Sequence, residues 1–379
     1  MLRNPALRIF ETLAVIKMKT LLSILTILLS HCLCGQSNDV WTSFWDKDST
    51  YIGYKNADGK IMIEPTFEGF MVADKFEKVI SVMTLADDKY ETYYLNKSGK
   101  KFGVDSVYFF DNTPDCESEG YIRFKDKKTD LVGMFDKNGK VVVPAEYNAL
   151  SRVQNGMIQA LKNAEKKYWD SHRESGCNHF SWKGGQELLI STDNKILVEN
   201  LEYDGQLDLY SLVANDNPEA EPNGACFQGT NNKYYHFIDY KKDFAIWLKV
   251  LTARLTQQNL IESSMDTIVY WKSGWTRIPK DEFIDSNYEI LSGLLKSIDN
   301  SKSDYFISID GLNSFMYTGN EYDKYFNTCG ESRYGKYPVM NLIINHKNET
   351  DLIQDHFDFL KTDIGYRLIN VTIRSEKIK

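Results

Sequence analysis

Four cysteines in the body of the chain are the residues whose chemistry is most distinctive. They stand far apart, at Cys116, Cys177, Cys226 and Cys329, and these spacings are too wide for a zinc knuckle or a thiol redox motif. In an oxidising compartment an even number of cysteines predicts disulfide bonds, and four allow three pairings among which the sequence does not choose. Free buried thiols are an equally good interpretation, because cysteine is among the most often buried residues.

A second group of residues has the donor types of a metal site. His172, Cys177 and His179 carry the imidazole and thiolate groups that zinc binds. A fourth ligand is not evident, and structural zinc sites usually come in paired short spacings. We therefore interpret this segment as an exposed loop and expect no metal.

The segment 330–336 has two glycines and a lysine at the spacing of a phosphate-binding loop. Tyr337 follows at the position where magnesium binding needs Ser or Thr, and no apolar strand leads into the segment. A polar loop is the favoured interpretation, so we expect no cofactor.

Trp271 and Trp275 flank a Ser-Gly pair. Two neighbouring indole rings could stack on a sugar, although packing in a core or hairpin is the favoured interpretation for large aromatic side chains.

A catalytic interpretation depends on residues that are distant in the sequence. The chain has no Gly-x-Ser-x-Gly nucleophile elbow. A hydrolase acting on an envelope or extracellular polymer would need at least two of five residues to converge in one pocket of the C-terminal domain: His236, Asp310, His346, Asp355 and His356. We assign no catalytic residue and keep this enzyme as the alternative hypothesis.

The first half of the chain contains a periodicity from which its structural elements can be predicted. Gly59, Gly99 and Gly139 recur at even intervals of 40 residues, and each is followed by Lys. The segments 51–67 and 131–147 align without a gap, which also superposes Gly53 on Gly133. Self-similarity at a fixed period indicates an internal repeat.

Each copy has the composition of a β-hairpin. Asp-Gly, Ser-Gly and Asn-Gly pairs supply the positive φ that a tight turn requires. The runs 61–63 and 141–143 that follow suit a buried strand, and Pro65 and Pro144 are expected to end it. Gly53 and Gly133 stand inside the preceding strand, where a glycine permits the close approach of a neighbouring aromatic side chain.

These residues resemble the WG repeat family of bacterial proteins, whose units read roughly aromatic-Gly-Tyr-Ile-Asp-x-x-Gly-Lys-x-Val-Ile-x-Pro-x-Tyr. The resemblance covers about residues 41–210, with a degenerate fourth copy at 192–203 displaced by an insertion. The Trp that names the family is Ile52 in the first copy and Val132 in the third, and Tyr93 replaces the inner glycine of the second.

The resemblance implies an array of stacked hairpins that serves as a scaffold or binding module. Such arrays occur mostly in exported or surface proteins, and the family has no general catalytic residues to carry over. Repeats of this kind gain stability by stacking, so we expect the array to form one cooperative domain over residues 41–214.

The first 35 residues have the pattern of a secretory signal peptide. Read from Met18, positive residues precede an apolar run at 21–29, which is too short for a membrane span. Residues 1–17 then form an upstream extension from an early start codon. Cleavage near Gly35 would release the chain, whereas lipidation of Cys32 would anchor it, although His31 departs from the small residue expected before such a cysteine.

A second unit is predicted after a polar connection at 215–224. Its apolar spacing predicts a helix over 243–260, a second helix capped by Ser286 and Glu289, and a third over 351–361. Strands are expected at 267–271, 304–308, 339–345 and 367–374. The fold class is therefore a β-rich repeat array of stacked hairpins followed by an α+β domain of unrecognised family at 225–379.

The net charge of the chain restricts the classes of partner that it is expected to bind. The formal net charge of −8 and the pI near 5.4 argue against nucleic acid. We expect an exported binding or scaffold protein in the periplasm, at the outer membrane or outside the cell, with a protein or an envelope polymer as its partner. Membrane contact is expected only through the signal peptide or a lipid anchor.

Overall fold

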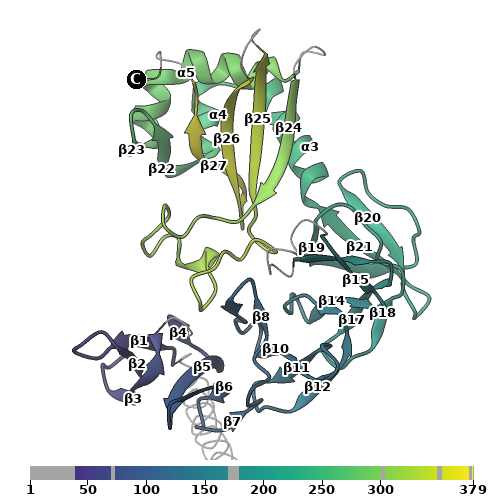
Figure 1. Ribbon diagram of the computed structural model, residues 1–379. Coiled ribbons are helices and arrows are strands. Elements are labelled where there is room, and N and C mark those ends of the chain that lie inside the picture. Colours follow the sequence, from purple (N-terminus) through teal and green to yellow (C-terminus); the bar gives the residue numbers. More distant parts are fainter. Residues whose placement is uncertain are drawn as a thin grey trace, which may run out of the picture.

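The computed structural model describes residues 39–69, 73–169, 179–299, 304–347, 352–374 and 378. The predicted signal peptide with Cys32, and the insertion residues His172 and Cys177, lie outside these residues. The described chain forms an arc of small antiparallel sheets and a C-terminal α+β domain above it (Figure 1). The fold class predicted from the sequence is thus confirmed.

Four three-stranded meanders make up most of the arc. In each meander the strands pair antiparallel, and the second strand lies in the middle. The first contains β1 (Trp41–Trp45), β2 (Tyr51–Lys55) and β3 (Ile61–Glu68); the second β5 (Val79–Ala86), β6 (Lys89–Asn96) and β7 (Lys101–Phe102). The third contains β10 (Tyr121–Lys125), β11 (Val132–Asp136) and β12 (Val141–Tyr147); the fourth β14 (Met157–Lys162), β17 (Gln186–Ser191) and β18 (Ile196–Val198).

Shorter strands fill the connections. β4 (Lys75–Phe76) pairs with β1, and β13 (Ala149–Leu150) pairs with β14. Two extra hairpins are formed by β8 (Phe109–Phe110) with β9 (Thr113–Pro114), and by β15 (Glu165–Tyr168) with β16 (Phe180–Lys183). The second of these hairpins lies in the insertion that displaces the fourth copy.

The same turn joins the second and third strands of every meander. In the first copy the Gly59 amide donates to Asn56 O at 3.0 Å, and the Asn56 amide donates to Lys60 O at 3.0 Å. The turn residue has a positive φ in all four copies: Gly59 (80°), Gly99 (80°), Gly139 (71°) and Asn194 (61°). Since most L residues resist this conformation, Gly or Asn is a backbone requirement here.

Gly53 and Gly133 lie at β-bulges of the middle strands, where the register against the third strand shifts. A Cβ at Gly133 would lie 2.5 Å from the ring of Phe124, so an aromatic side chain does rest on this glycine. At Gly53 the neighbour is backbone, because a Cβ would lie 2.5 Å from Ile63 O. Both positions therefore exclude any side chain.

A fifth sheet completes the arc and corrects the predicted connection at 215–224. Its strands are β19 (Leu207–Asn215), β20 (Gly224–Gln228) and β21 (Tyr234–Asp239), in the order β19-β21-β20. Residues 215–224 join β19 to β20 within this sheet instead of linking two units. Their Pro, Gly and acidic composition indicates an exposed connection, but it does not distinguish a linker from a long loop inside a sheet.

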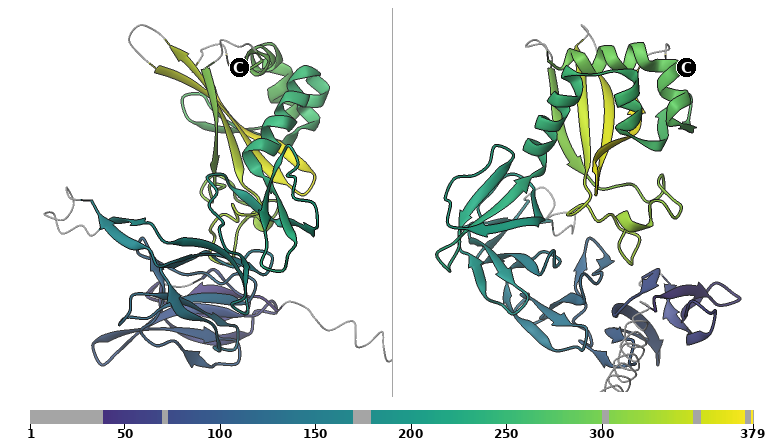
Figure 2. Two further views of the ribbon diagram at one scale, coloured as in Figure 1. Left: turned by 90° about the vertical axis from the view of Figure 1, so that its right-hand side faces the viewer. Right: turned by 180° about the vertical axis from the view of Figure 1, so that it is seen from behind.

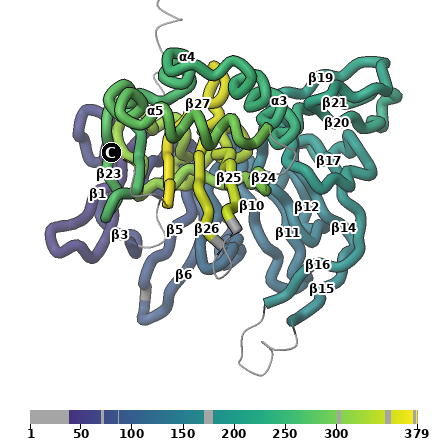
Figure 3. Tube along the Cα trace, turned by 90° about the horizontal axis from the view of Figure 1, so that it is seen from above, coloured from purple at the N-terminus to yellow at the C-terminus, as the bar shows by residue number. Residues whose placement is uncertain are grey.

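The C-terminal domain is a six-stranded sheet in the order β23-β22-β27-β26-β25-β24. Its strands are β22 (Ser264–Trp271), β23 (Trp275–Pro279), β24 (Asp304–Asp310), β25 (Val339–Lys347), β26 (Leu352–Thr362) and β27 (Gly365–Thr372). The helices α3 (Tyr240–Ala253), α4 (Gln257–Glu262) and α5 (Lys280–Ser297) all cover the same face of the sheet (Figures 2 and 3). The main core, including Phe244, Leu291, Phe357 and Phe359, lies between these helices and the sheet.

The predicted helix over 351–361 is wrong: the segment contains β26. Phe357 and Phe359 are fully buried against the helices, whereas His356 and Asp358, which alternate with them in the chain, belong to the opposite face. This alternation has the period of a strand, and pairing with β25 and β27 on both sides stabilises it.

The first two predicted helices are present, but they begin and end at other residues than predicted. The predicted helix over 243–260 is divided into α3 and α4, because the Thr256 side chain caps a new helix by accepting from the Asn259 amide. The second begins at Lys280, directly after Pro279, and not at Ser286. Asp281 and Glu282 in its first turn favour this start through the helix dipole.

Candidate functional site

A cleft of about 1320 Å³ lies between the inner side of the arc and a long loop of the C-terminal domain. The loop, residues 311–338, connects β24 to β25 and contains a short 3-10 helix, η2 (Asp323–Tyr325). It descends from the sheet into the concave side of the arc (Figure 1). The array contributes the other wall of the cleft through Lys75, Glu77 and residues within the segments 108–123, 149–159 and 204–210.

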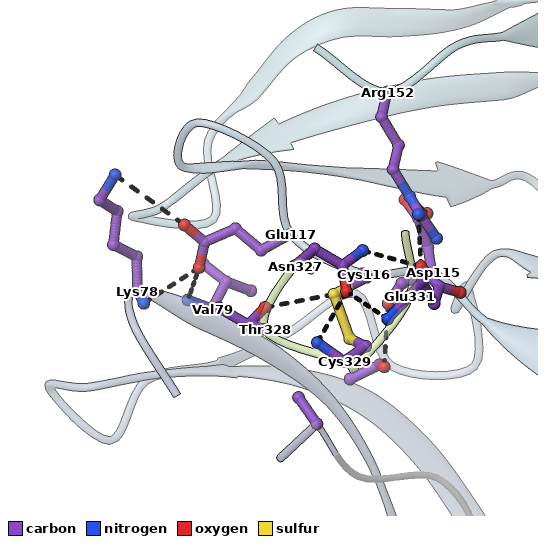
Figure 4. The surroundings of a disulfide bond; sticks show 12 residues. Lys78, Val79, Asp115, Cys116, Glu117, Arg152, Asn327, Thr328, Cys329 and Glu331 are labelled. Carbon is purple, nitrogen blue, oxygen red and sulfur yellow. Dashed lines mark hydrogen bonds and ion pairs between the residues drawn. A yellow bond between two sulfur atoms is a disulfide. The ribbon is translucent and has the colours of Figure 1, made fainter. Parts of the chain in front are cut away.

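A disulfide bond joins the two walls. Cys116, between β9 and β10, is bonded to Cys329 of the loop, 213 residues later in the chain, with a Cα–Cα distance of 6.2 Å (Figure 4). Of the other cysteines predicted as disulfide candidates, Cys226 has a free thiol and Cys177 lies outside the described residues.

Backbone hydrogen bonds fix the cysteine in the loop. The Asn327 side chain begins a turn, and its Oδ1 accepts from the amides of Cys329 (2.9 Å) and Glu331 (3.0 Å). Gly330 follows with a φ of 74°. The loop also pairs with the first sheet, because the Lys75 amide donates to Thr328 O at 2.9 Å.

Asp115, next to the disulfide, is the centre of a buried charge network. Only 2% of it is exposed, and it accepts from Arg123 Nε at 3.0 Å and from Arg152 Nε at 3.1 Å. Arg152 also forms an ion pair with Glu331 of the loop. Burial alone would raise the pKa of the Asp115 carboxyl, but the two guanidinium groups outweigh it and hold the pKa below its usual range.

The pKa of Glu117, which follows Cys116 in the chain, is shifted in the opposite direction to that of Asp115. The Oε2 atom of Glu117 accepts from the amides of Val79 (2.7 Å) and Lys78 (3.0 Å), which ties the segment to the second meander. Burial raises the pKa of this carboxyl, because these hydrogen bonds and the distant Lys78 ammonium, 3.9 Å away, only partly offset the loss of water.

A second junction closes the far end of the cleft. Tyr240, the first residue of α3, is fully buried and donates from its hydroxyl toward Gly335 O (3.1 Å) and Lys336 O (3.2 Å). The Tyr240 amide also donates to Gln206 O of the array at 3.1 Å. The loop is therefore held to the array directly at Cys329 and, through Tyr240, at Gly335 and Lys336.

The residues named for a hydrolase do not line this cleft. Two of them meet, since His346 Nε2 and Asp355 Oδ2 are 2.7 Å apart on β25 and β26. His356 is next to this pair in the chain, whereas Asp310 ends β24 and accepts from the Gly311 amide. His236 lies in another sheet, on β21, where its Nε2 is 3.0 Å from Asn215 Oδ1.

The motifs that resembled ligand sites have structural explanations. Gly330 belongs to the turn that holds Cys329, so the segment 330–336 is part of the cleft wall. Within the described part of the chain, no three His, Cys, Asp or Glu side chains are grouped in a way that could hold a metal ion. Nor does any described helix combine the length and apolar character needed to cross a membrane.

Sequence reasoning missed the network around Asp115. The only local signal was the segment Asp115-Cys116-Glu117, in which two acidic residues flank a cysteine. Acidic residues beside a cysteine are common on surfaces, and the partners that bury these two come from distant segments, so the pattern alone did not indicate a site.

The comparison with known families supports the repeat. Residues 133–168 match the family model of the WG containing repeat. The match begins at Gly133 in β11 and ends in β15, so it covers the inner glycine and the turn of the third copy. No curated protein and no solved structure matches the chain. The resemblance inferred from the turn glycines is confirmed for the third copy: the chain is β-rich and contains a WG containing repeat at residues 133–168.

Proposed function

We propose that the protein is exported to the bacterial cell envelope and acts there as a binding or scaffold protein, with the cleft between the array and the loop 311–338 as its binding site. The observation that carries the proposal is the Cys116–Cys329 disulfide with the buried Asp115 network beside it. Together they fix both walls of the cleft before a partner arrives. A preorganised site binds more tightly because less conformational entropy is lost on binding.

The same disulfide supports export. Such bonds form and persist in oxidising compartments and are rare in the cytosol. The signal pattern of residues 1–35 supports it independently. The proposed location is the periplasm, the outer membrane surface or the medium, with lipidation of Cys32 and cleavage near Gly35 as the two alternatives.

Size and charge of the cleft favour an extended partner. Its volume exceeds the roughly 300–1,000 Å³ of small-molecule sites. Its walls contain both lysine or arginine and aspartate or glutamate side chains, including Lys241, Arg333, Glu77 and Asp204. A segment of a protein or of an envelope polymer fits such a mixed surface better than a polyanion, and the net charge of −8 opposes nucleic acid.

Export is tested by intact-mass analysis of the protein purified from the membrane and medium fractions of its own cells. A chain that starts near Gln36 indicates ordinary cleavage, and an acylated chain that starts at Cys32 indicates the lipid anchor. Recovery of the chain with residues 18–35 intact in the cytosol would contradict export.

Binding in the cleft is tested with a photoreactive amino acid placed at Phe110, which lines the cleft and is 73% exposed. The matched control carries the same probe at Val250, which is 60% exposed on α3 and does not line the cleft. We expect a discrete cross-linked product from intact cells only for position 110. Equal products at both positions, or none at 110, would contradict a binding role for the cleft.

A further inference from the structure

Within the described part of the chain, no α-helix covers the second face of the C-terminal sheet. All three helices lie on the other side (Figures 2 and 3), and the loop 311–338 covers only the lower end of this face, through Tyr317, Tyr322 and Tyr325. We call the remainder, between this loop and the far strand ends, the open face.

One row of the open face is aromatic at both ends. The register places Phe306, Ile343, His356 and Thr372 side by side on β24, β25, β26 and β27. On β22 and β23 the row continues with Trp271 and Trp275, which are paired across the two strands and have ring centroids 5.2 Å apart. Trp271, Trp275 and Phe306 are 40%, 54% and 47% exposed. At a spacing of about 4.8 Å between strands, the row spans roughly 24 Å.

The next row toward the loop is polar. From β24 to β27 it consists of Ser308, Asn341, Asp358 and Asn370, each paired with the next in register. It ends at Arg277 on β23, whose guanidinium lies 5.7 Å from the centre of the Tyr317 ring. Hydroxyl, amide and carboxyl groups on β24 to β27 therefore lie in one line beside the aromatic row, and the guanidinium of Arg277 follows beyond the buried, apolar Val269 of β22.

The polar row contains an unsatisfied acceptor. Asn370 is 6% exposed and donates from Nδ2 to Asp358 Oδ2 at 2.6 Å, but its own Oδ1 is buried and has no hydrogen-bond partner among the described residues. Buried polar atoms are normally paired, so an exception of this kind indicates a group that a ligand or water completes. The second oxygen of Asp358 likewise has no hydrogen bond to a described residue.

We propose that the open face binds a neutral, extended oligosaccharide. Sugar rings present apolar C–H faces that stack on Trp and Phe, and hydroxyl groups that donate to carboxylate and amide oxygens and accept from guanidinium and amide N–H groups. Both kinds of contact are arranged here in adjacent parallel rows, with aromatic rings at the two ends, which suits a chain of sugars better than a single one. The carboxyl of Asp358, with Asp310 on the same face, disfavours an acidic polymer. The polar row meets the cleft at Ser308, whereas the aromatic row, with Trp271, Trp275 and Phe306, does not line the cleft.

The proposal is tested by calorimetric titration of the full mature chain with cellohexaose, chitohexaose and, as a charged probe, hexagalacturonate. We expect saturable binding of at least one neutral hexasaccharide and weaker binding of the acidic one. Trp271→Ala, Trp275→Ala and Phe306→Ala should each weaken binding roughly three- to tenfold. Asp358→Asn should weaken it as well, since one acceptor oxygen becomes a donor.

Two controls separate this site from others. Trp169→Ala removes an indole that is also half-exposed, at 51%, but lies beyond the sheet at the end of β15, and it should leave affinity unchanged. Phe110→Ala alters only the cleft and should also have no effect, so the outcome does not depend on the function proposed for the cleft. Failure of both neutral hexasaccharides to bind, tighter binding of hexagalacturonate, or equal affinities for the wild type and the three aromatic variants would overturn the proposal.

Discussion

Ser98 and Cys329 occupy equivalent positions in two turns with the same hydrogen bonding. Each lies two residues after an Asn whose Oδ1 accepts from its amide, and each precedes a Gly with a φ of 80° or 74°. The first turn belongs to the array and the second to the loop of the C-terminal domain. The loop thus presents to the cleft the turn that the repeats use, with a cysteine in the place of a serine.

Removal of the disulfide between Cys116 and Cys329 should destabilise the folded protein. Cys329→Ser abolishes the disulfide with Cys116, and the loop that this bond closes is long, so we expect a loss of about 2–5 kcal/mol in the free energy of unfolding. Urea denaturation without reductant measures it. Cys226→Ser is the matched control, because that thiol is free, and it should change stability little. Equal stability of Cys329→Ser and the wild type would refute the structural role of the bond.

The turn glycines differ in what a methyl group would meet. At Gly99 nothing lies within 4 Å of an added Cβ, so Gly99→Ala should cost only the backbone strain of positive φ, about 1–2 kcal/mol. At Gly139 the Cβ would lie 2.5 Å from the Phe102 ring. Gly139→Ala should therefore be clearly more destabilising, and Gly139→Val more so. Thermal melting compares the three; the reverse order for the two alanine variants would contradict the packing.

Asp115 and Glu117 should give opposite responses to pH. The pKa of Asp115 is lowered, so its contribution to stability is present above about pH 4 and is lost as the pH falls. Asp115→Asn should remove this acid sensitivity and destabilise the protein at neutral pH by about 3–5 kcal/mol, because two arginines lose a buried partner.

The pKa of Glu117 is raised, so its contribution is present at low pH and is lost as the pH rises through the raised value. Glu117→Gln should accordingly gain stability relative to the wild type between about pH 4 and pH 7. Denaturation curves across this range measure both variants, and parallel pH profiles for the two would show that the assigned directions are wrong.

Asp358 provides a separate pH test in the C-terminal domain. Burial raises its pKa to about 6, the hydrogen bond from Asn370 lowers it in part, and Asp310 raises it further. Its ionisation therefore destabilises the fold as the pH rises through about 6, and Asp358→Asn should gain up to about 3 kcal/mol relative to the wild type between pH 4 and pH 7. Fluorescence-detected unfolding measures the gain. A constant difference between variant and wild type across this range would exclude the raised pKa.

The array could be predicted because its determinants are local. A Gly after Asp, Ser or Asn specifies a turn within a few positions, the runs 61–63 and 141–143 specify strands, and the even spacing reveals the copies. The strand β26 was missed because Leu, Ile and Phe in the segment 351–361 also fit a helical spacing. Only pairing with β25 and β27 decides between the two, and that pairing involves distant residues.

The cleft could not be predicted for the same reason. Cys116 was one of four cysteines with three possible pairings, and Asp115 and Arg152 are ordinary charged residues in the sequence. What makes them a site is the descent of the loop 311–338 into the arc, which is a property of the whole fold.

The position of the disulfide in the chain has a consequence for biosynthesis. Cys116 emerges early, just before the third meander, but its partner Cys329 follows 213 residues later. If the protein is exported as proposed, the thiol of Cys116 must stay unbonded while Cys226, which precedes Cys329 in the chain, enters the same oxidising environment. Correct maturation therefore requires either rapid folding that shelters Cys226 in β20 or an isomerase that reverses the premature bond, and cells that lack thiol isomerase activity should accumulate the mispaired form.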